Sequence, residues 1–444
     1  MQPPKRTGEK TPGGVPWSEA RAEGQLRSLE LFGMRFGLDR MRRMMTVLGS
    51  PEQAFPSIQV LGTNGKSSTT RMTAAILTRH GLRTGAYTSP HLVAYRERIL
   101  IDEREIEADA FAGAIARATW AAERVNRTLS EDDHVTQFEL LTAAALWQMS
   151  EQEVEVAVIE AGLGGRFDAT SVIGAGVTVL TNVGLEHTRW LGPTVSDIAE
   201  EKLAVVQPGA ELVLGADLDP AALEVAERIA TERGAHISGP SPVAEGLELR
   251  AQGSFQRTNF ALATAAAEAH LRTAGRALDA RAGAEAAAET EIPGRLQVIS
   301  QDPLTVLDGA HNPDAVEALL GSIGEITGER TVGLVLGVLE DKDAVSMLRL
   351  LMGFCQRAWF TAPPSERALS PAALQSQARR LGFGETICEP RPERALSQAQ
   401  EWAAANGAAV LATGSVYLVG DLLGRLKGSD RLVEPEIRFG NYPR

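Results

Sequence analysis

The sequence is poor in cysteine and has no long apolar segment. Its two cysteines, Cys355 and Cys388, are too few for a disulfide framework or a cysteine-type zinc site. Each lies beside a strand-like run, so we expect both to be small core residues. No apolar run reaches the roughly 18 residues of a membrane-spanning helix. We therefore expect a cytoplasmic protein that does not associate with membranes.

The sequence also lacks an excess of positive charge. It has 44 Lys and Arg residues against 57 Asp and Glu residues, a net charge of −13. Proteins that bind nucleic acids present basic surfaces, so this balance argues against nucleic-acid binding as the main role. An acidic protein can still contain a basic pocket, and small anionic ligands therefore stay compatible with the composition.

The chain of 444 residues alternates strand-like and helix-like patterns along most of its length, which predicts an α/β fold. We expect a flexible N-terminal tail at 1–20, a nucleotide-binding domain with a mainly parallel sheet at 21–293, and a smaller Rossmann-like α/β domain at 294–444. The Pro293-Gly294 pair marks the boundary. Ligands of such sheets bind at the carboxyl ends of the strands.

One strand end has the composition of a phosphate-binding loop. After the apolar run that ends at Leu61, the chain reads Gly-Thr-Asn-Gly-Lys-Ser-Ser over 62–68 and continues as an amphipathic helix. Glycines let the backbone approach a phosphate, and the helix N-terminus offers free N–H groups. The spacing is shorter than in the usual G-x-x-x-x-G-K-[ST] motif, since Val60 stands at the first glycine position. A glycine turn that only caps a helix is the structural alternative.

Three further polar residues have two interpretations each. Glu160 ends the run Val-Ala-Val-Ile and is either a magnesium ligand or a solvated carboxylate. His187 follows another strand in a polar, glycine-containing loop, where a ligand role is favoured over a structural one. Lys202 follows two acidic residues on a predicted helix, and the pattern fits a surface ion pair as well as a lysine near phosphate.

The second domain contributes its own polar turn. Asp308-Gly-Ala-His-Asn-Pro313 ends a strand and begins a helix, and so many polar residues on a tight turn are unusual for simple packing. Arg295 lies at the hinge, where its guanidinium could reach a phosphate held by the first domain.

These motifs together resemble folylpolyglutamate synthase/dihydrofolate synthase, a branch of the Mur ligase superfamily. The resemblance runs from about Leu31 to Leu423 and rests on several long motifs in the same order. They are Gly62-Thr-Asn-Gly-Lys-Ser-Ser-Thr, Thr88-Ser-Pro-His-Leu, Glu160-Ala-Gly-Leu-Gly-Gly-Arg-Phe-Asp-Ala-Thr, Gly184-Leu-Glu-His-Thr-Arg-Trp-Leu-Gly, Leu307-Asp-Gly-Ala-His-Asn-Pro and Gly414-Ser-Val-Tyr-Leu-Val-Gly.

The resemblance implies an ATP-dependent ligase that adds L-glutamate to a folate or dihydropteroate carboxylate through an acyl phosphate. It implies both the dihydrofolate synthase and the folylpolyglutamate synthase activity, a monomer, two Mg²⁺ ions and a possible K⁺ ion. A second Mur-type ligase acting on a cell-wall nucleotide peptide is the nearest alternative. A nucleotide switch protein is a third, but Glu340-Asp341-Lys342-Asp343 lacks the Asn or Thr of a guanine-reading motif.

The resemblance also assigns roles to residues of this sequence. The implied catalytic residues are Lys66, His187 and Lys202. The implied ATP-binding residues are Gly62, Thr63, Asn64, Gly65, Lys66, Ser67, Ser68, Asn259, Arg295, Asp308 and His311. The implied metal ligands are Ser89, Glu160, His187 and Lys202, the last as a carbamate. The implied folate-binding residues are Phe138, Glu139, Arg166 and Asp168.

The sequence departs from the family pattern at two positions near these ligands. Ser67 stands where the family usually has a glycine, and Glu186 replaces a common aspartate beside His187. The segment after Lys202 also differs from the usual one, which weakens the expectation of a carbamate.

Overall fold

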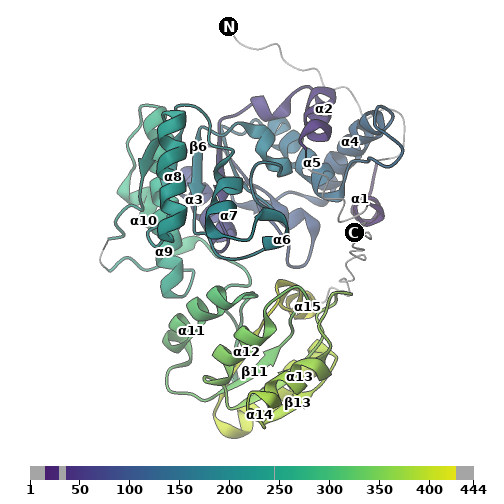
Figure 1. Cartoon of the computed structure of the whole chain (residues 1–444), viewed down its shortest axis with the longest axis vertical. Coiled ribbons are helices and arrows are strands. Elements are labelled where there is room, and N and C mark those ends of the chain that lie inside the picture. The colour runs from purple at the N-terminus through teal and green to yellow at the C-terminus, as the bar shows by residue number, and fades with distance from the viewer. Residues whose placement is uncertain (1–15, 30–36, 245, 427–444) are drawn as a thin grey trace.

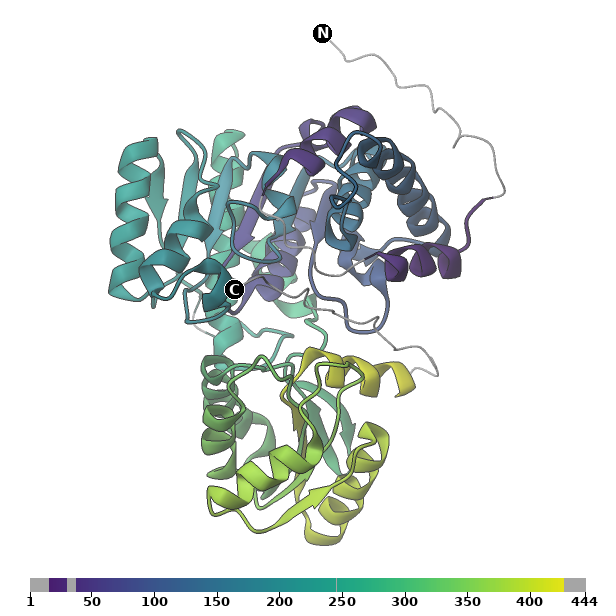
Figure 2. The same ribbon diagram turned by 45° about the vertical axis from the view of Figure 1, so that its right-hand side comes forward.

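The computed structural model describes residues 16–29, 37–244 and 246–426, and these residues form two α/β lobes (Figure 1). The first lobe contains an eight-stranded sheet and the second a six-stranded sheet. Figure 2 shows the second lobe, coloured green to yellow, below the first from another side. The sheets are separated between Ser238 and Gln297, an interval that contains the predicted boundary at Pro293-Gly294.

The first sheet has the order β4-β3-β2-β5-β1-β6-β7-β8 and is parallel from β2 to β8. Its strands are β1 (Ser57–Leu61), β2 (Thr84–Tyr87), β3 (Ile99–Ile101), β4 (Arg104–Glu105), β5 (Val156–Glu160), β6 (Val177–Leu180), β7 (Glu211–Leu214) and β8 (His236–Ser238). Its helices are α1 (Glu19–Ser28), α2 (Asp39–Leu48), α3 (Lys66–Arg79), α4 (Ala108–Asn126), α5 (Gln137–Glu151), α6 (Thr188–Leu191), α7 (Val195–Leu203), α8 (Pro220–Arg233), α9 (Ser254–Thr273) and α10 (Ala280–Glu289).

The second sheet has the order β13-β12-β11-β14-β10-β9. Its strands are β9 (Gln297–Gln301), β10 (Leu304–Leu307), β11 (Val332–Leu336), β12 (Arg357–Phe360), β13 (Thr386–Cys388) and β14 (Ala409–Thr413). Its helices are α11 (Pro313–Thr327), α12 (Ala344–Met352), α13 (Pro371–Arg380), α14 (Pro392–Asn406) and α15 (Val416–Leu426).

Strand β5 shows why the strands of the first sheet appear as apolar runs in the sequence. All five of its residues are buried, because helices cover both faces of the sheet. Val156 and Val158 pack with α3, α9 and α10, whereas Ala157 and Ile159 pack with α1, α2, α4 and α5. Alternate side chains of one strand therefore hold two helical layers in place. The second sheet repeats this arrangement, with α11 to α13 on one face and α14 and α15 on the other.

The fold confirms a mainly parallel two-domain α/β architecture but adds antiparallel edges. Strands β3 and β4 pair antiparallel beyond β2, and β9 pairs antiparallel with β10. The sequence predicted only a charged loop at 96–98, where the structure has a 3₁₀ helix (Tyr95–Arg98) followed by β3. Strands of two or three residues are too short to show a period in sequence.

The prediction for one cysteine is wrong. Cys355 is buried, and burial raises the pKa of its thiol to about 12. Cys388 is exposed instead, because it ends β13, a strand at the edge of the second sheet. The predicted tail at 1–20 lies mostly outside the described residues, and α1 begins within it, where Ser18 caps the helix by accepting a hydrogen bond from the N–H of Arg21.

Within the described ranges, no helix combines the length and the apolar character needed to cross a membrane.

The two lobes touch where the loop after β2 meets α15. The carboxylate of Glu97 accepts hydrogen bonds from the backbone N–H groups of Leu92, Val93 and Ala94, at 2.8 to 3.0 Å, and so fixes this loop. A Cβ atom at Gly420 of α15 would overlap the carbonyl oxygen of Leu92. Gly420 therefore allows the backbones of the two lobes to approach closely.

We expect Gly420→Ala to lower the melting temperature, since the added methyl group forces the lobes apart or distorts α15 at a cost of roughly 1–3 kcal/mol. Gly324→Ala in α11 is the matched control, because a Cβ there has no neighbour within 4 Å. It should stabilise its helix by about 1 kcal/mol and raise the melting temperature. Scanning calorimetry of both variants measures the two shifts, and shifts of the same sign would contradict the close approach.

Candidate functional site

The loop after β1 has the shape of a phosphate cradle and is fixed by its neighbours. Gly62 has a φ of 146°, and a Cβ there would overlap the side chain of Thr181. Gly65 has a φ of 82° and precedes α3. The side-chain oxygen of Asn182 accepts the N–H groups of Thr63 and Asn64 at 3.2 and 2.8 Å. Both glycines are therefore required, and the loop is held in place from β6.

Two lysines point at this loop. The ammonium group of Lys66 donates to the carbonyl oxygens of Gly62 and Thr63, both at 2.9 Å. The ammonium group of Lys202 reaches the same Gly62 oxygen at 2.8 Å, although Lys202 comes from α7. Lys202 is 2% exposed, so the structure rejects the surface ion pair and places this lysine beside the loop.

The environment of Lys202 changes its acidity. Burial lowers the pKa of Lys202 to about 8, and repulsion by Lys66 adds to this effect. Glu186, whose carboxylate lies 3.5 Å from the Lys202 nitrogen, acts in the opposite direction. At neutral pH roughly a tenth of Lys202 is therefore an uncharged amine, against less than a thousandth for a lysine in water.

Glu160 lies at the centre of the strand ends and is buried rather than solvated. One carboxylate oxygen accepts the hydroxyl of Ser67 and the other accepts the N–H of Ser89, both at 2.9 Å. Burial raises the pKa of Glu160, while Lys66 and the two hydrogen bonds lower it. The structure thus brings together the predicted residues Ser67, Ser89 and Glu160, although Ser67 and Glu160 are 93 positions apart in sequence.

His187 lies at the mouth of the cavity, where the lobes face each other. His187 stays partly open to solvent although it lines the cavity, has a φ of 49° and precedes the short helix α6. Loss of solvation lowers the pKa of His187 to about 4, and Lys342 of the second lobe contributes to this shift. His187 is therefore a neutral imidazole at pH 7.

These side chains fit a magnesium ion that also binds phosphate. Among the residues that the structure describes, no three His, Cys, Asp or Glu side chains are grouped as a metal site. Mg²⁺ needs no such cage, because it binds one or two carboxylates and takes other oxygens from phosphate and water. Glu160 and the Ser89 hydroxyl, two of the four predicted metal ligands, supply oxygens of this kind, and the Ser67 hydroxyl adds another. The predicted set of Ser89, Glu160, His187 and Lys202 stays a prediction.

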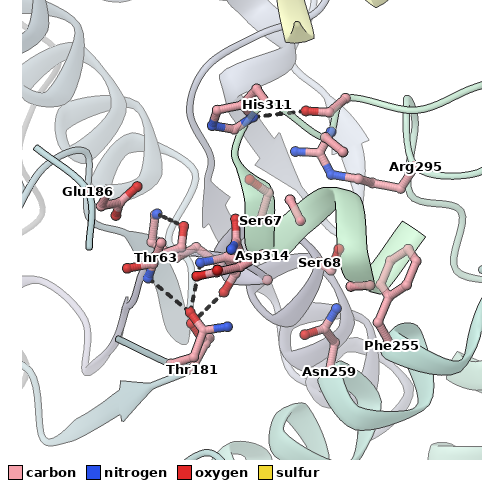
Figure 3. A pocket seen from close by; sticks show the side chains of 18 of the residues that line it. Thr63, Ser67, Ser68, Thr181, Glu186, Phe255, Asn259, Arg295, His311 and Asp314 are labelled. Carbon is pink, nitrogen blue, oxygen red and sulfur yellow. Dashed lines mark hydrogen bonds between the residues drawn. The ribbon is translucent and has the colours of Figure 1, made fainter. Parts of the chain in front are cut away.

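The second lobe places its polar turn opposite the loop (Figure 3). Asp308 is buried and accepts the N–H groups of Leu296 and Ala310 at 2.9 and 2.7 Å. Burial raises the pKa of Asp308, and Arg295 counteracts the shift. His311 lies 2.9 Å from the carbonyl oxygen of Gly309, and burial lowers its pKa to about 4. The turn, together with the Arg295 side chain that lies against Gly309, therefore presents one guanidinium and one neutral imidazole.

A cavity of about 450 Å³ lies between these groups, a volume suited to a small-molecule ligand. Asn259 lines it from α9, and the buried Gln256 accepts a hydrogen bond from the Asn259 amide at 3.0 Å. Many of the predicted site residues line this cavity. They are Thr63, Asn64, Gly65, Lys66, Ser67, Ser68, Ser89, Glu160, His187, Lys202, Asn259, Arg295, Asp308 and His311.

Two of the four predicted folate-binding residues lie close together. A Cβ at Gly162 would come within 2.6 Å of the Phe138 ring and 3.1 Å of the Asp168 carboxylate. Asp168 accepts the N–H groups of Leu163 and Thr170 at 2.8 and 3.0 Å, and burial raises its pKa. Phe138 and Asp168 are therefore placed next to the cavity wall formed by Gly162, and their ligand role stays a prediction.

The other two predicted folate-binding residues have protein partners. Both oxygens of Glu139 accept the side chain of Arg40 at 3.0 Å, and Glu139 also bonds to the backbone N–H of Thr136. Arg166 donates to Glu201 at 2.8 Å on the surface. Neither side chain lines the cavity, so a direct ligand role for Glu139 or Arg166 stays a prediction without a contact to support it.

Asp217, Phe255 and Asp314 are among the residues that line the cavity and that sequence reasoning missed. Asp217 follows β7, so the strand-end rule could have found it. Asp314 is in the first turn of α11, directly after the Asp308–Pro313 motif, and Phe255 is in the first turn of α9. No sequence pattern brings these two helix starts to the loop after β1.

Comparisons with known proteins point to one family over most of the chain. A model of the Mur ligase middle domain matches residues 60–230, and a model of the Mur ligase glutamate ligase domain matches residues 294–416. The folylpolyglutamate synthase of Lacticaseibacillus casei is 34% identical over 361 residues, which are 76% of this chain and 84% of the relative.

Two other proteins are similar over nearly the whole chain. The dihydrofolate synthase/folylpolyglutamate synthase of Escherichia coli is 30% identical over 419 residues, 90% of this chain and 93% of the relative. The solved structure of Mycobacterium tuberculosis folylpolyglutamate synthase complexed with ADP has a TM-score of 0.86 and 30% identity, and covers 93% of this chain and 99% of that one.

We expect His187→Ala to raise the magnesium concentration needed for half-maximal nucleotide binding about tenfold, because an imidazole next to the cavity is lost. Isothermal titration calorimetry with Mg²⁺ at a fixed nucleotide concentration measures this change. His91→Ala is the control, since His91 is buried and accepts a hydrogen bond from Arg98 at 3.0 Å. An unchanged magnesium dependence in His187→Ala would return His187 to a structural role.

Proposed function

The chain belongs to the folylpolyglutamate synthase/dihydrofolate synthase family of Mur ligases, and we propose that its site joins L-glutamate to both dihydropteroate and reduced folates. The protein is an ATP-dependent ligase that adds glutamate to folates. We infer that one site performs both activities because some relatives have both activities in their names. The cell-wall ligase and switch-protein alternatives lose their support with this family membership.

The reaction must first activate a carboxylate, which is a poor electrophile. In the proposed first step a carboxylate oxygen of the folate attacks the γ-phosphorus of ATP, the bond to the bridging oxygen breaks, and ADP leaves. The product is an acyl phosphate. Phosphoryl transfer depends mainly on positioning and on neutralising charge. The loop at 62–68, the Lys66 ammonium and the Arg295 guanidinium are the groups of this chain suited to that task.

In the second step the amino group of glutamate attacks the carbonyl carbon of the acyl phosphate. The tetrahedral intermediate expels inorganic phosphate, the nitrogen loses a proton, and an amide remains. His187 and His311 are neutral at pH 7, so they can hydrogen-bond to phosphate or substrate without adding charge. Magnesium, when bound, would neutralise part of the phosphate charge, and Glu160 with Ser67 and Ser89 would hold it.

The observation that carries this proposal is the meeting of two lobes at one cavity. The first lobe supplies the phosphate loop with Lys66, and the second supplies Arg295, Asp308 and His311. Figure 3 shows Arg295 and His311 at the same pocket as Thr63 and Ser67 of the loop. Such an arrangement can hold a nucleotide in one lobe and complete the site from the other. The monomeric state, a potassium ion and a second magnesium ion, which the resemblance implies, stay predictions, as does the cytoplasmic location expected from the lack of a long apolar run.

The direct test measures ADP release with glutamate and either dihydropteroate or tetrahydrofolate. We expect release with both acceptors and no release when either acceptor or glutamate is omitted. Lys66→Ala should reduce turnover at least a hundredfold through loss of a phosphate contact, with little change in melting temperature because Lys66 is only half-buried. Activity with one acceptor only would reject the dual function, and full activity of Lys66→Ala would reject the loop assignment.

We also propose that Lys202 is carbamylated. The uncharged amine adds to the carbon of CO₂ and releases a proton, which converts a buried cation into a carboxylate that can bind a second magnesium ion. A pKa of about 8 favours the modification, because only the neutral amine reacts. The amine is protonated below pH 8, so carbamate occupancy should rise as the pH rises through 8.

Intact-mass measurement under native conditions, at pH 6.5 and 8.5 with bicarbonate, tests this proposal. We expect the mass of one CO₂ on the wild-type chain, more at the higher pH, and none on Lys202→Arg. Activity of Lys202→Ala should fall at least tenfold and recover partly with added short-chain carboxylates. A wild-type chain that shows no added mass at either pH, like Lys202→Arg, would contradict the carbamate.

A further inference from the structure

The two lobes are joined by a reciprocal pair of side-chain amides at the phosphate loop. Asn64 lies in the loop after β1, and Asn312 lies immediately before α11 in the second lobe. The Asn312 amide donates to the side-chain oxygen of Asn64 at 3.0 Å, and the Asn64 amide donates to the oxygen of Asn312 at 3.3 Å. The two residues are 248 positions apart in sequence.

The first-lobe partner is held from its own backbone. The N–H of Asn64 donates to the side chain of Asn182, and its carbonyl oxygen accepts the hydroxyl of Thr181 at 2.6 Å. Both residues follow β6, so the backbone of Asn64 is fixed while its side chain extends toward the second lobe. Asn64 also lines the cavity between the lobes.

The second-lobe partner is fixed by capping. The side-chain oxygen of Asn312 also accepts the N–H of Ala315 at 2.8 Å, which is the usual bond of a helix N-cap. Asn312 directly follows His311, whose ring reaches the carbonyl oxygen of Gly309 at 2.9 Å. A side chain that holds Asn312 therefore also fixes the turn that presents His311.

This pair is not explained by burial. Both asparagines are only half-buried, so water could satisfy their amides at little energetic cost. Two reciprocal hydrogen bonds do have a defined geometry, and they join the lobes at the wall of the cavity. The contact between Leu92 and Gly420, and the hydrogen bond between Ser254 and Ser322 at 2.8 Å, join the lobes at other elements.

We propose that Asn64 and Asn312 are positioning residues for the ligase reaction. Their pair sets the second lobe's polar turn in register with the phosphate loop, so that His311 and Arg295 meet the nucleotide held by the first lobe. The proposal rests on the proposed function for its kinetic part only. The pair itself is a property of the lobe arrangement and can be measured without turnover.

A double-mutant cycle tests the coupling. Asn312→Ser keeps a capping oxygen for α11 but is too short to reach Asn64. We expect it to lower kcat about tenfold or more, because reacting groups are misplaced, while the KM for ATP stays within about twofold. In the Asn64→Ala background the same substitution should change kcat less than about twofold, since its partner is already absent.

Small-angle X-ray scattering of the same four proteins without ligands gives the second readout. We expect Asn312→Ser and Asn64→Ala each to broaden the distribution of distances between the lobes, and the double variant to add nothing further. Ser370→Ala is the matched control, because Ser370 caps α13 of the same lobe by accepting the Ala373 N–H at 3.1 Å and is not among the residues that line the cavity. It should lose a similar cap without changing kcat or the distance distribution.

The outcomes separate the positioning role of the amide pair from the proposed ligase function. Non-additive kcat effects together with coupled scattering changes support the positioning role. Additive effects in both readouts, or an Asn312→Ser variant identical to Ser370→Ala, overturn it. A wild-type chain without ligase activity would reject the proposed function, and the scattering cycle alone would then decide whether the amide pair sets the lobe arrangement.

Discussion

One carbonyl oxygen organises the charge of this site. The Gly62 oxygen accepts hydrogen bonds from both Lys66 and Lys202, at 2.9 and 2.8 Å, and thereby draws two ammonium groups to the same loop. Burial of Lys202, together with repulsion by the nearby Lys66 ammonium, lowers the pKa of Lys202 to about 8. A protein with a net charge of −13 thus concentrates positive potential where a polyphosphate would bind. The positive φ of Gly62 and the absence of a Cβ there make this convergence possible.

The acids around the loop balance these cations in different ways. Glu186 lies 3.5 Å from the Lys202 nitrogen, and interaction with Lys66 and Lys202 lowers its pKa despite burial. Burial instead raises the pKa of Glu160, and the hydroxyl of Ser67 is one of the groups that lower it again. The Ser67 hydroxyl, which the glycine expected here from the family resemblance would lack, donates to Glu160 at 2.9 Å and stabilises the ionised carboxylate. An ionised Glu160 is the form that can bind a metal, which gives the departure at Ser67 a chemical consequence.

The sequence predicted the parts of the site that follow strands and missed the parts that depend on distant partners. The loop at 62–68 and Glu160 are recognisable because a strand, a turn and a helix follow each other within a few residues, and parallel strands bring their ends to one edge. The sequence does not decide whether Lys202 is buried, because a lysine beside acidic residues on a helix fits a surface position equally well. The partnership of Glu139 with Arg40 spans 99 positions and leaves no local signal. The prediction that Cys388 is buried is wrong for a related reason. The position of its strand at the edge of the sheet is set by topology, which the local sequence does not show.

The division of the site between two lobes explains why several contacts between them have narrow steric limits. A Cβ at Gly184 of the first lobe would come within 2.6 Å of the Asp314 carboxylate of the second lobe, and Gly420 is equally restricted by Leu92. Packed glycines fix how near the lobes come but have no side chain to specify lateral register. The hydrogen bonds between Asn64 and Asn312, which are directional, can supply that register at the cavity itself. A ligase that must place a phosphate from one lobe beside groups of the other needs both kinds of constraint, since a close but sliding interface would leave the reacting groups misaligned.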